Sequence, residues 1–111
     1  MLIRKKVVKE ADDSYIESIF DSTNILKTTY FPTQKRLYIS FRRGETYSYG
    51  NVDESLYKKF EDSDSQGEFF IQEIKKKPNE FPYRKEFSLY SSEIQDIKKI
   101  ISEHKNKEDH E

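Results

Sequence analysis

The sequence predicts a small α+β domain in which two short helices pack on one face of a three-stranded antiparallel meander. Apolar residues recur with a period of two between residues 24 and 52, which is typical of strands with one buried face. Helix-capping residues and helical periodicity follow in residues 53–77. The length of 111 residues suits one domain, and 8 Tyr and 8 Phe supply large core side chains in a chain that is 37% charged.

An N-terminal extension is expected before the meander, in residues 1–21. Residues 2–8 have the composition of a short strand with a basic middle. Residues 12–22 are expected to form a short helix, because Ser14 and Glu17 have the spacing of a capping box. Four apolar residues of this segment would form the buried stripe of that helix: Tyr15, Ile16, Ile19 and Phe20.

The three strands of the meander are expected at NILKTTYF, RLYISFR and TYSYGNV, joined across PTQK and RRGE. The second connection decides which side of the sheet Tyr47 and Tyr49 occupy. A three-residue loop with Gly44 in the left-handed conformation places both rings on the buried side. A two-residue turn would expose both rings, but it needs φ > 0 at Arg43, which arginine rarely adopts. We therefore favour the three-residue loop.

Two short helices should follow the third strand. Asp53 is the expected N-cap of the first helix, and Ser65 with Glu68 matches a capping box at the start of the second. Pro78 should end the second helix, because the residue before a proline is pushed out of the α region. Residues 79–90 alternate aromatic and polar residues after this proline, so we expect an extended strap that lies on the domain.

A C-terminal helix is expected within residues 85–104. It should begin near Ser92, whose spacing to Gln95 matches a capping box, and it should end near His104. Residues 105–111 are almost all charged and are expected to form a disordered tail.

Isoleucines with helical spacing give this last helix an apolar stripe. The stripe can pack on the chain's own sheet, or it can bind a partner protein or a second copy of the chain in a homo-oligomer. The residues of the stripe that a partner would contact are Ile94, Ile97 and Ile101.

The middle strand of the meander is expected to carry a basic and aromatic outward face. Arg36, Tyr38 and Arg42 alternate out of the core, and Lys35 and Arg43 lie at the two ends of the strand. Such a face combines cations for phosphates with a ring for base stacking, as an RNA-binding surface requires. The plainer alternative is a solvated strand face, where arginine and tyrosine are common for solubility and strand propensity.

Residues with catalytic or metal-binding chemistry are scarce in this chain. Cysteine is absent, and both histidines, His104 and His110, lie near the C-terminus. The predicted folded part therefore lacks the Cys–His or Ser–His pairing of nucleophilic catalysis and the ligand set of a zinc site. The three glycines match no phosphate-binding loop. We expect no catalytic, metal-binding or cofactor-binding residues, and hence no enzyme.

The overall charge does not favour a polyanionic partner. Lys and Arg number 20 and Asp and Glu number 21, so any attraction to nucleic acid must be local. No apolar segment has the length of a signal-peptide core or of a membrane span. We expect a cytoplasmic protein that does not bind membranes.

The order of several motifs in residues 22–84 resembles the KTSC family. The central Tyr-x-Tyr of that family is met by Tyr47 and Tyr49, and its later small-Gly-x-aromatic helix start is met by Ser65 and Gly67. The further matching segments are Asn24-Ile25, Tyr30, LYISF and SQGEFF.

This family is a short domain first noted at the C-terminus of some lysyl-tRNA synthetases and also found as small stand-alone bacterial and phage proteins. The resemblance implies no established activity, although RNA binding has been suggested for the family. Together with the outward face of the middle strand, it leads us to expect a small non-enzymatic binding module with RNA as its partner. The alternative is a protein-interaction or structural accessory role, including that of a phage-encoded protein, through the isoleucine stripe.

Overall fold

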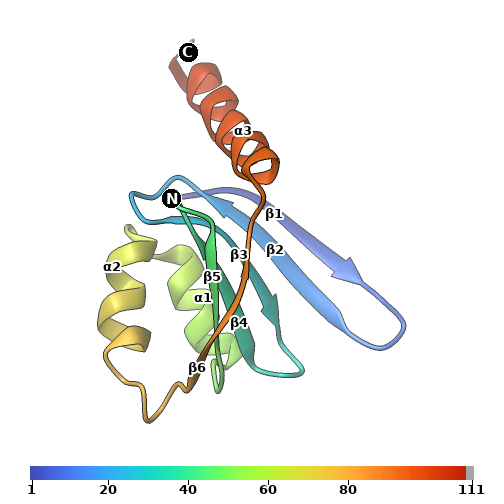
Figure 1. The fold of residues 1–111 in the computed structure, drawn as a ribbon, viewed down its shortest axis with the longest axis vertical. Coiled ribbons are helices and arrows are strands. Elements are labelled where there is room, and N and C mark those ends of the chain that lie inside the picture. The colour runs from blue at the N-terminus through green and yellow to red at the C-terminus, as the bar shows by residue number, and fades with distance from the viewer. Residues whose placement is uncertain (110–111) are drawn as a thin grey trace.

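A computed structural model describes residues 1–109, and the expectations for residues 110 and 111, including His110, lie outside this part. Six strands form one antiparallel sheet in which neighbours in the chain are neighbours in the sheet (Figure 1). The strands are β1 (Leu2–Lys9), β2 (Ser14–Phe20), β3 (Ile25–Phe31), β4 (Arg36–Phe41), β5 (Glu45–Tyr49) and β6 (Tyr83–Ser88). The helices are α1 (Glu54–Asp62), α2 (Gln66–Phe70), its π-helical continuation η1 (Ile71–Lys75), and α3 (Ser91–Asp109).

The predicted α+β class is confirmed, but the predicted three-stranded sheet is too small. β3, β4 and β5 are the predicted meander, and β1 is the predicted N-terminal strand. The other two strands come from segments for which a helix and a strap were expected.

The predicted N-terminal helix is wrong, because its residues form β2. Ile16 and Phe20 contact the core beneath α1 and α2. On the other face of the same strand, Ile19 packs beneath α3 and the ring of Tyr15 lies 5.3 Å from that of Phe31. A strand with apolar side chains on both faces has the same spacing as a helical stripe, so this pattern does not distinguish the two. β1 and β2 therefore continue the same sheet as β3.

The predicted strap is correct in being extended, but residues Tyr83–Ser88 are a sixth strand. They pair antiparallel with β5, with a bulge between the pairs Glu45–Ser88 and Tyr47–Lys85. The aromatic alternation that suggested a strap is thus the alternation of an edge strand.

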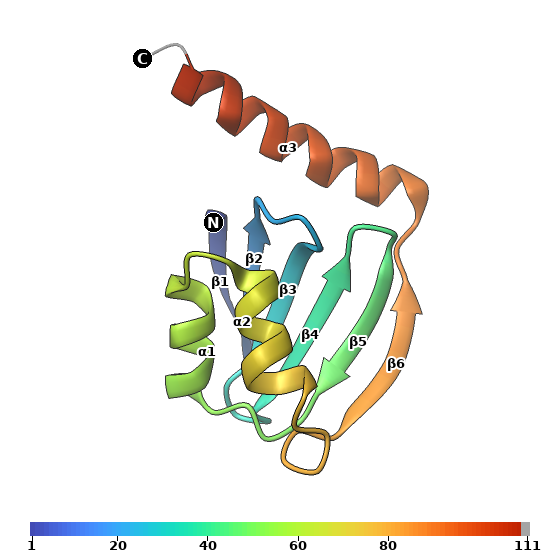
Figure 2. The same cartoon turned by 90° about the vertical axis from the view of Figure 1, so that its left-hand side faces the viewer.

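Helices lie on both faces of the sheet, but they cover them unequally. α1, α2 and η1 cover one face, which we call the helix face (Figure 2). α3 lies across one end of the sheet and packs on the opposite face, which we call the open face. The main core lies on the helix face and consists of Phe20, Ile25, Tyr30, Leu37, Ile39, Tyr49, Val52, Tyr57, Phe60, Phe70, Ile74 and Phe81.

The isoleucine stripe of α3 packs within the chain. Ile97 and Ile101 are 9% and 5% exposed and form a second cluster with Leu26 and Leu89, against which Ile94 is partly buried. The stripe is therefore not available to a partner while α3 is docked. No helix within residues 1–109 is long and apolar enough to span a membrane.

The ends of α3 differ from the prediction. The helix begins at Ser91, where the Tyr90 N–H donates to Glu93 Oε1 at 3.2 Å, so the expected capping box at Ser92 is wrong. The helix also continues to Asp109, beyond the predicted end and into the expected tail. By contrast, the caps of α1 and α2 are confirmed: Asp53 accepts from the Leu56 N–H at 2.8 Å, and Ser65 accepts from the Glu68 N–H at 3.3 Å.

The favoured β4–β5 loop is confirmed. Gly44 has φ +98 and its N–H donates to the Phe41 carbonyl at 2.8 Å. In the resulting register Ile39 faces Tyr47 and Leu37 faces Tyr49, which places both tyrosines on the helix face.

Replacing Gly44 with alanine should lower the free energy of unfolding by about 1–3 kcal/mol. A Cβ there would lie 2.9 Å from Ile94 Cδ1, at a φ that L-residues rarely adopt. Urea denaturation measures the change, with Gly67→Ala as the control because a Cβ there meets ordinary contacts. Equal stability of Gly44→Ala and wild type would contradict the assigned loop.

Replacing Ile97 with alanine should lower the free energy of unfolding by about 2–5 kcal/mol, because a buried side chain of the α3 cluster is lost. The exposed neighbour Lys98 provides the control, since Lys98→Ala should change stability by less than about 0.5 kcal/mol. If both variants unfold at the same urea concentration as the wild type, α3 is not docked in solution.

Alkali should destabilise the fold between pH 10 and pH 12. Burial raises the pKa of Tyr30, Tyr49 and Tyr57 from 10 to about 12. The unfolded chain loses these protons first, so their contribution to stability is complete below pH 10 and is lost as pH rises to 12. Urea denaturation at a series of pH values measures the loss, which Tyr30→Phe should reduce. A free energy of unfolding that stays constant up to pH 12 would refute the raised pKa values of these three tyrosines.

Candidate functional site

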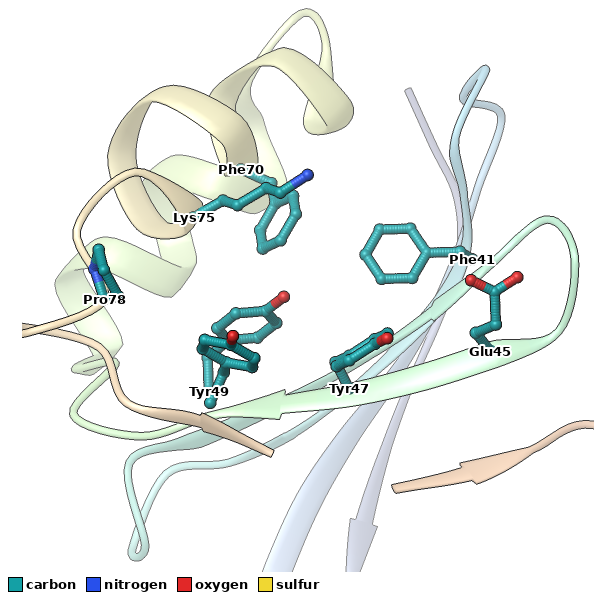
Figure 3. A pocket seen from close by; sticks show the side chains of 8 residues that line it. Phe41, Glu45, Tyr47, Tyr49, Phe70, Lys75 and Pro78 are labelled. Atoms are coloured by element: carbon teal, nitrogen blue, oxygen red, sulfur yellow. The ribbon is translucent and has the colours of Figure 1, made fainter. Parts of the chain in front are cut away.

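A groove lies on the helix face between η1 and strands β5 and β6 (Figure 3). One part has a volume of about 550 Å³, and an adjoining part of about 510 Å³ shares four of its lining residues. We call both parts together the tyrosine groove. The first part is lined by Phe41, Glu45, Tyr47, Tyr49, Phe70, Lys75, Pro78 and Tyr83. The second part adds Thr23, Asn24, Arg42, Arg43, Gly67 and Ile71.

Buried rings form the floor of the groove. Tyr49 and Phe70 are 6% and 3% exposed, and their ring centroids lie 5.0 Å apart in an edge-to-face arrangement. Burial raises the pKa of Tyr49 to about 12, so its phenol is protonated and can donate a hydrogen bond at neutral pH.

Less buried rings form the walls. Tyr47 is half-buried, and its ring lies 6.2 Å from that of Phe41 and 6.4 Å from that of Tyr83. Tyr83 stands at the rim and is 58% exposed. Tyr47 and Tyr49 therefore share one face of the sheet but differ in role: the first ring faces the groove, and the second belongs mainly to the core.

The helical wall depends on the start of α2. Ser65 caps this helix, and it does not line the groove. At Gly67, an added Cβ would lie 3.4 Å from Asn24 Nδ2. Residue 67 therefore lies next to the β2–β3 connection, and Phe70 and Lys75, later in the same helical segment, line the groove.

Three cations and one carboxylate line the groove. Arg43 and Lys75 are exposed and Glu45 is half-buried. Within residues 1–109 the side chains of these three residues take part in no ion pair or hydrogen bond. Arg42 is anchored, because its Nε donates to the Ser22 carbonyl at 2.7 Å. The charges of Arg43, Lys75 and Glu45 are therefore available to a ligand.

The structure separates the residues for which one RNA-binding face was predicted. Arg42 and Arg43 lie at the tyrosine groove, whereas Arg36 and Tyr38 lie on the open face. The expectation of a single surface is wrong, because the strand ends at Phe41 and the next two residues belong to the loop. Lys35 occupies the β3–β4 turn with φ +53, where its N–H donates to the Pro32 carbonyl at 3.2 Å.

Arg36 is part of a hydrogen-bonded chain across three strands. Its Nη1 donates to Ser48 Oγ at 2.7 Å, and that hydroxyl donates to Glu86 Oε1 at 2.7 Å. Arg84 lies 3.3 Å from the same carboxylate oxygen. The cation is thus largely committed to neighbours in the sheet.

A row of three rings lies beside Arg36 on the open face. The ring of Phe31 is 5.3 Å from that of Tyr15 and 5.6 Å from that of Tyr38. All three are half-buried. We call these three residues the ring row. Of these three residues, the outward face expected from the sequence includes only Tyr38, because Tyr15 belongs to the segment expected to be helical.

Sequence reasoning did not identify Glu45, Lys75 and Tyr83 as site residues. Lys75 belongs to a lysine run at a helix end, where cations are common without any binding role. Only the pairing of β5 with β6 brings Tyr83 opposite Tyr49. Within residues 1–109, no group of three or more His, Asp or Glu side chains is placed to hold a metal ion.

Comparisons with known proteins point to one family. The KTSC domain model matches residues 21–77. The crystal structure of a KTSC domain protein from Yersinia pestis is similar, with 34% sequence identity and a TM-score of 0.58. The similarity covers 64% of this chain and 96% of that chain. No curated protein matches the sequence.

Proposed function

The chain belongs to the KTSC domain family, and we propose that it is a non-enzymatic module that binds single-stranded RNA in the tyrosine groove. The observation that supports this proposal most is the meeting of rings and cations in one hollow. Tyr47 and Tyr83 offer ring surface, and Arg43 and Lys75 offer positive charge on the same groove. Single-stranded nucleic acids are bound by this combination, with bases on rings and phosphates on cations.

The rings of the groove are suited to stacking because they are already held in place. Tyr47 lies on a central strand, and its neighbours Phe41 and Tyr83 come from the two adjacent strands. A base that enters the groove therefore restricts the motion of few side chains, which keeps the entropic cost of binding low. Stacking of a base on one aromatic residue contributes about 1–3 kcal/mol to the binding free energy.

The charge of the groove favours an anion although the whole chain does not. The formal net charge of the chain is −1. At the groove, Arg42, Arg43 and Lys75 face a single carboxylate, that of Glu45. Since screening in salt limits charge interactions to roughly 10 Å, a phosphate in the groove responds mainly to this local excess.

The two other candidate surfaces are less suited to this role. The isoleucine stripe of α3 is buried against Leu26 and Leu89, so a partner could bind it only if α3 left the sheet. The ring row of the open face has Arg36 beside it, but that guanidinium already donates to Ser48.

Replacing Tyr47 with alanine should weaken the binding of labelled single-stranded RNA at least about fivefold, because a stacking ring is lost. Arg43→Gln should also weaken binding, and it should reduce the slope of log affinity against log salt by about 0.7, the contribution of one phosphate contact. Fluorescence anisotropy at several salt concentrations measures both effects.

Variants on the open face are the matched controls. Tyr38→Ala removes a ring of similar exposure and Arg36→Gln removes a charge, and neither change should alter RNA affinity. Circular dichroism checks that every variant is folded. Binding that is lost in Tyr38→Ala but kept in Tyr47→Ala would move the site to the open face, and the absence of saturable binding would refute an RNA function.

A further inference from the structure

We infer that the tyrosine groove selects guanine, with Glu45 reading the edge of the base and Arg43 and Lys75 holding its phosphate. This inference rests on the proposed RNA function of the same groove and adds a base preference to it. The ligand is a guanine nucleotide, either free or as one unstacked residue of an RNA strand.

The shape of the groove limits it to very few bases. Its ring-lined part has a volume of about 550 Å³, which is in the range of pockets for single small ligands. Figure 3 shows the rings of Phe41, Tyr47, Tyr49 and Phe70 around this space. A continuous stack of bases needs an extended track of rings, whereas this enclosure offers walls on several sides of one base.

Glu45 is the acidic residue that lines both parts of the groove. It belongs to β5 and lies beside Phe41 (Figure 3). Its carboxylate offers two acceptor oxygens and no donor. Because it is half-buried and forms no hydrogen bond or ion pair within residues 1–109, a ligand that supplies donors relieves the cost of its partial desolvation.

Guanine matches this carboxylate better than the other bases do. Its Watson–Crick edge carries two adjacent donors, N1–H and the N2 amino group, which can meet both carboxylate oxygens at once. Adenine and cytosine each offer an amino group next to an acceptor nitrogen, and uracil offers one N–H between two carbonyls that would repel the carboxylate. A good bidentate contact should therefore favour guanine at least about fivefold.

The phosphate position follows from the remaining charges. Lys75 lies on the helical wall, across the groove from β5 (Figure 3), and Arg43 lies in the β4–β5 loop. Both are exposed and have no partner among the described residues. A nucleotide with its base against Glu45 can therefore direct its phosphate to these two cations at the mouth.

The first test is a titration of the whole chain with free nucleotides, in which the amide chemical shifts report binding. GMP should bind at least about fivefold more tightly than UMP, and inosine monophosphate, which lacks the N2 amino group, should fall between them. Glu45→Gln should abolish this preference, whereas Glu68→Gln, an exposed carboxylate on α2 outside the groove, should leave it intact. Both changes are at or near the surface and leave the core rings in place.

The second test separates the two sources of the ligand and uses uridine RNA of about ten nucleotides with or without one guanosine. A preference for the RNA with guanosine that is lost in Glu45→Gln supports the inference. If GMP also binds saturably, the groove accepts free nucleotides as well as RNA. If GMP does not bind saturably, the ligand is RNA alone. If both RNAs bind the wild type with equal affinity and neither binds Tyr47→Ala, the guanine inference is overturned and the proposed RNA function stands. If neither RNA nor GMP binds, the guanine inference and the proposed RNA function are both overturned.

Discussion

The conformation of Gly44 is the constraint on which the sheet and the groove depend. Its φ of +98 closes a three-residue loop that sets the register of β4 and β5. A register shifted by one residue would move every side chain of β5 to the other face of the sheet. Tyr49 would then leave the core, Tyr47 would leave the groove, and the buried hydroxyls of Thr46 and Ser48 would face the helices.

Tyr47 and Tyr49 show how one strand contributes side chains to both the core and the tyrosine groove. Tyr47 and Tyr49 point to the same face, but Phe70 covers only the second. A ring-lined hollow that stays open to solvent is uncommon in a small soluble domain, because burial of that apolar surface would stabilise the fold. The helical layer therefore ends where the groove begins, and this incomplete coverage leaves room for a ligand.

The distribution of charge in three dimensions reconciles a nearly neutral chain with the proposed polyanionic ligand. The lysines and arginines are balanced by acidic residues over the whole sequence, and several pairs, such as Lys5–Glu61 and Lys77–Glu73, lie away from the groove. Arg43 and Lys75 remain unpaired within residues 1–109. A phosphate at the surface interacts mainly with the nearby excess of positive charge and less with the net charge of the chain.

Features that depend on near neighbours could be predicted from the sequence alone: the glycine that closes the β4–β5 loop, the caps at Asp53 and Ser65, and the alternation of β3, β4 and β5. The remaining features depend on contacts between distant segments of the chain. Residues 14–20 became a strand because two layers cover both of its faces, and Tyr83 reached the groove because β6 pairs with β5. Arg42 was separated from Arg36 because the strand ends between them. Local hydrogen bonds and backbone sterics act within a few residues, whereas the covering of a face depends on segments far apart in the chain.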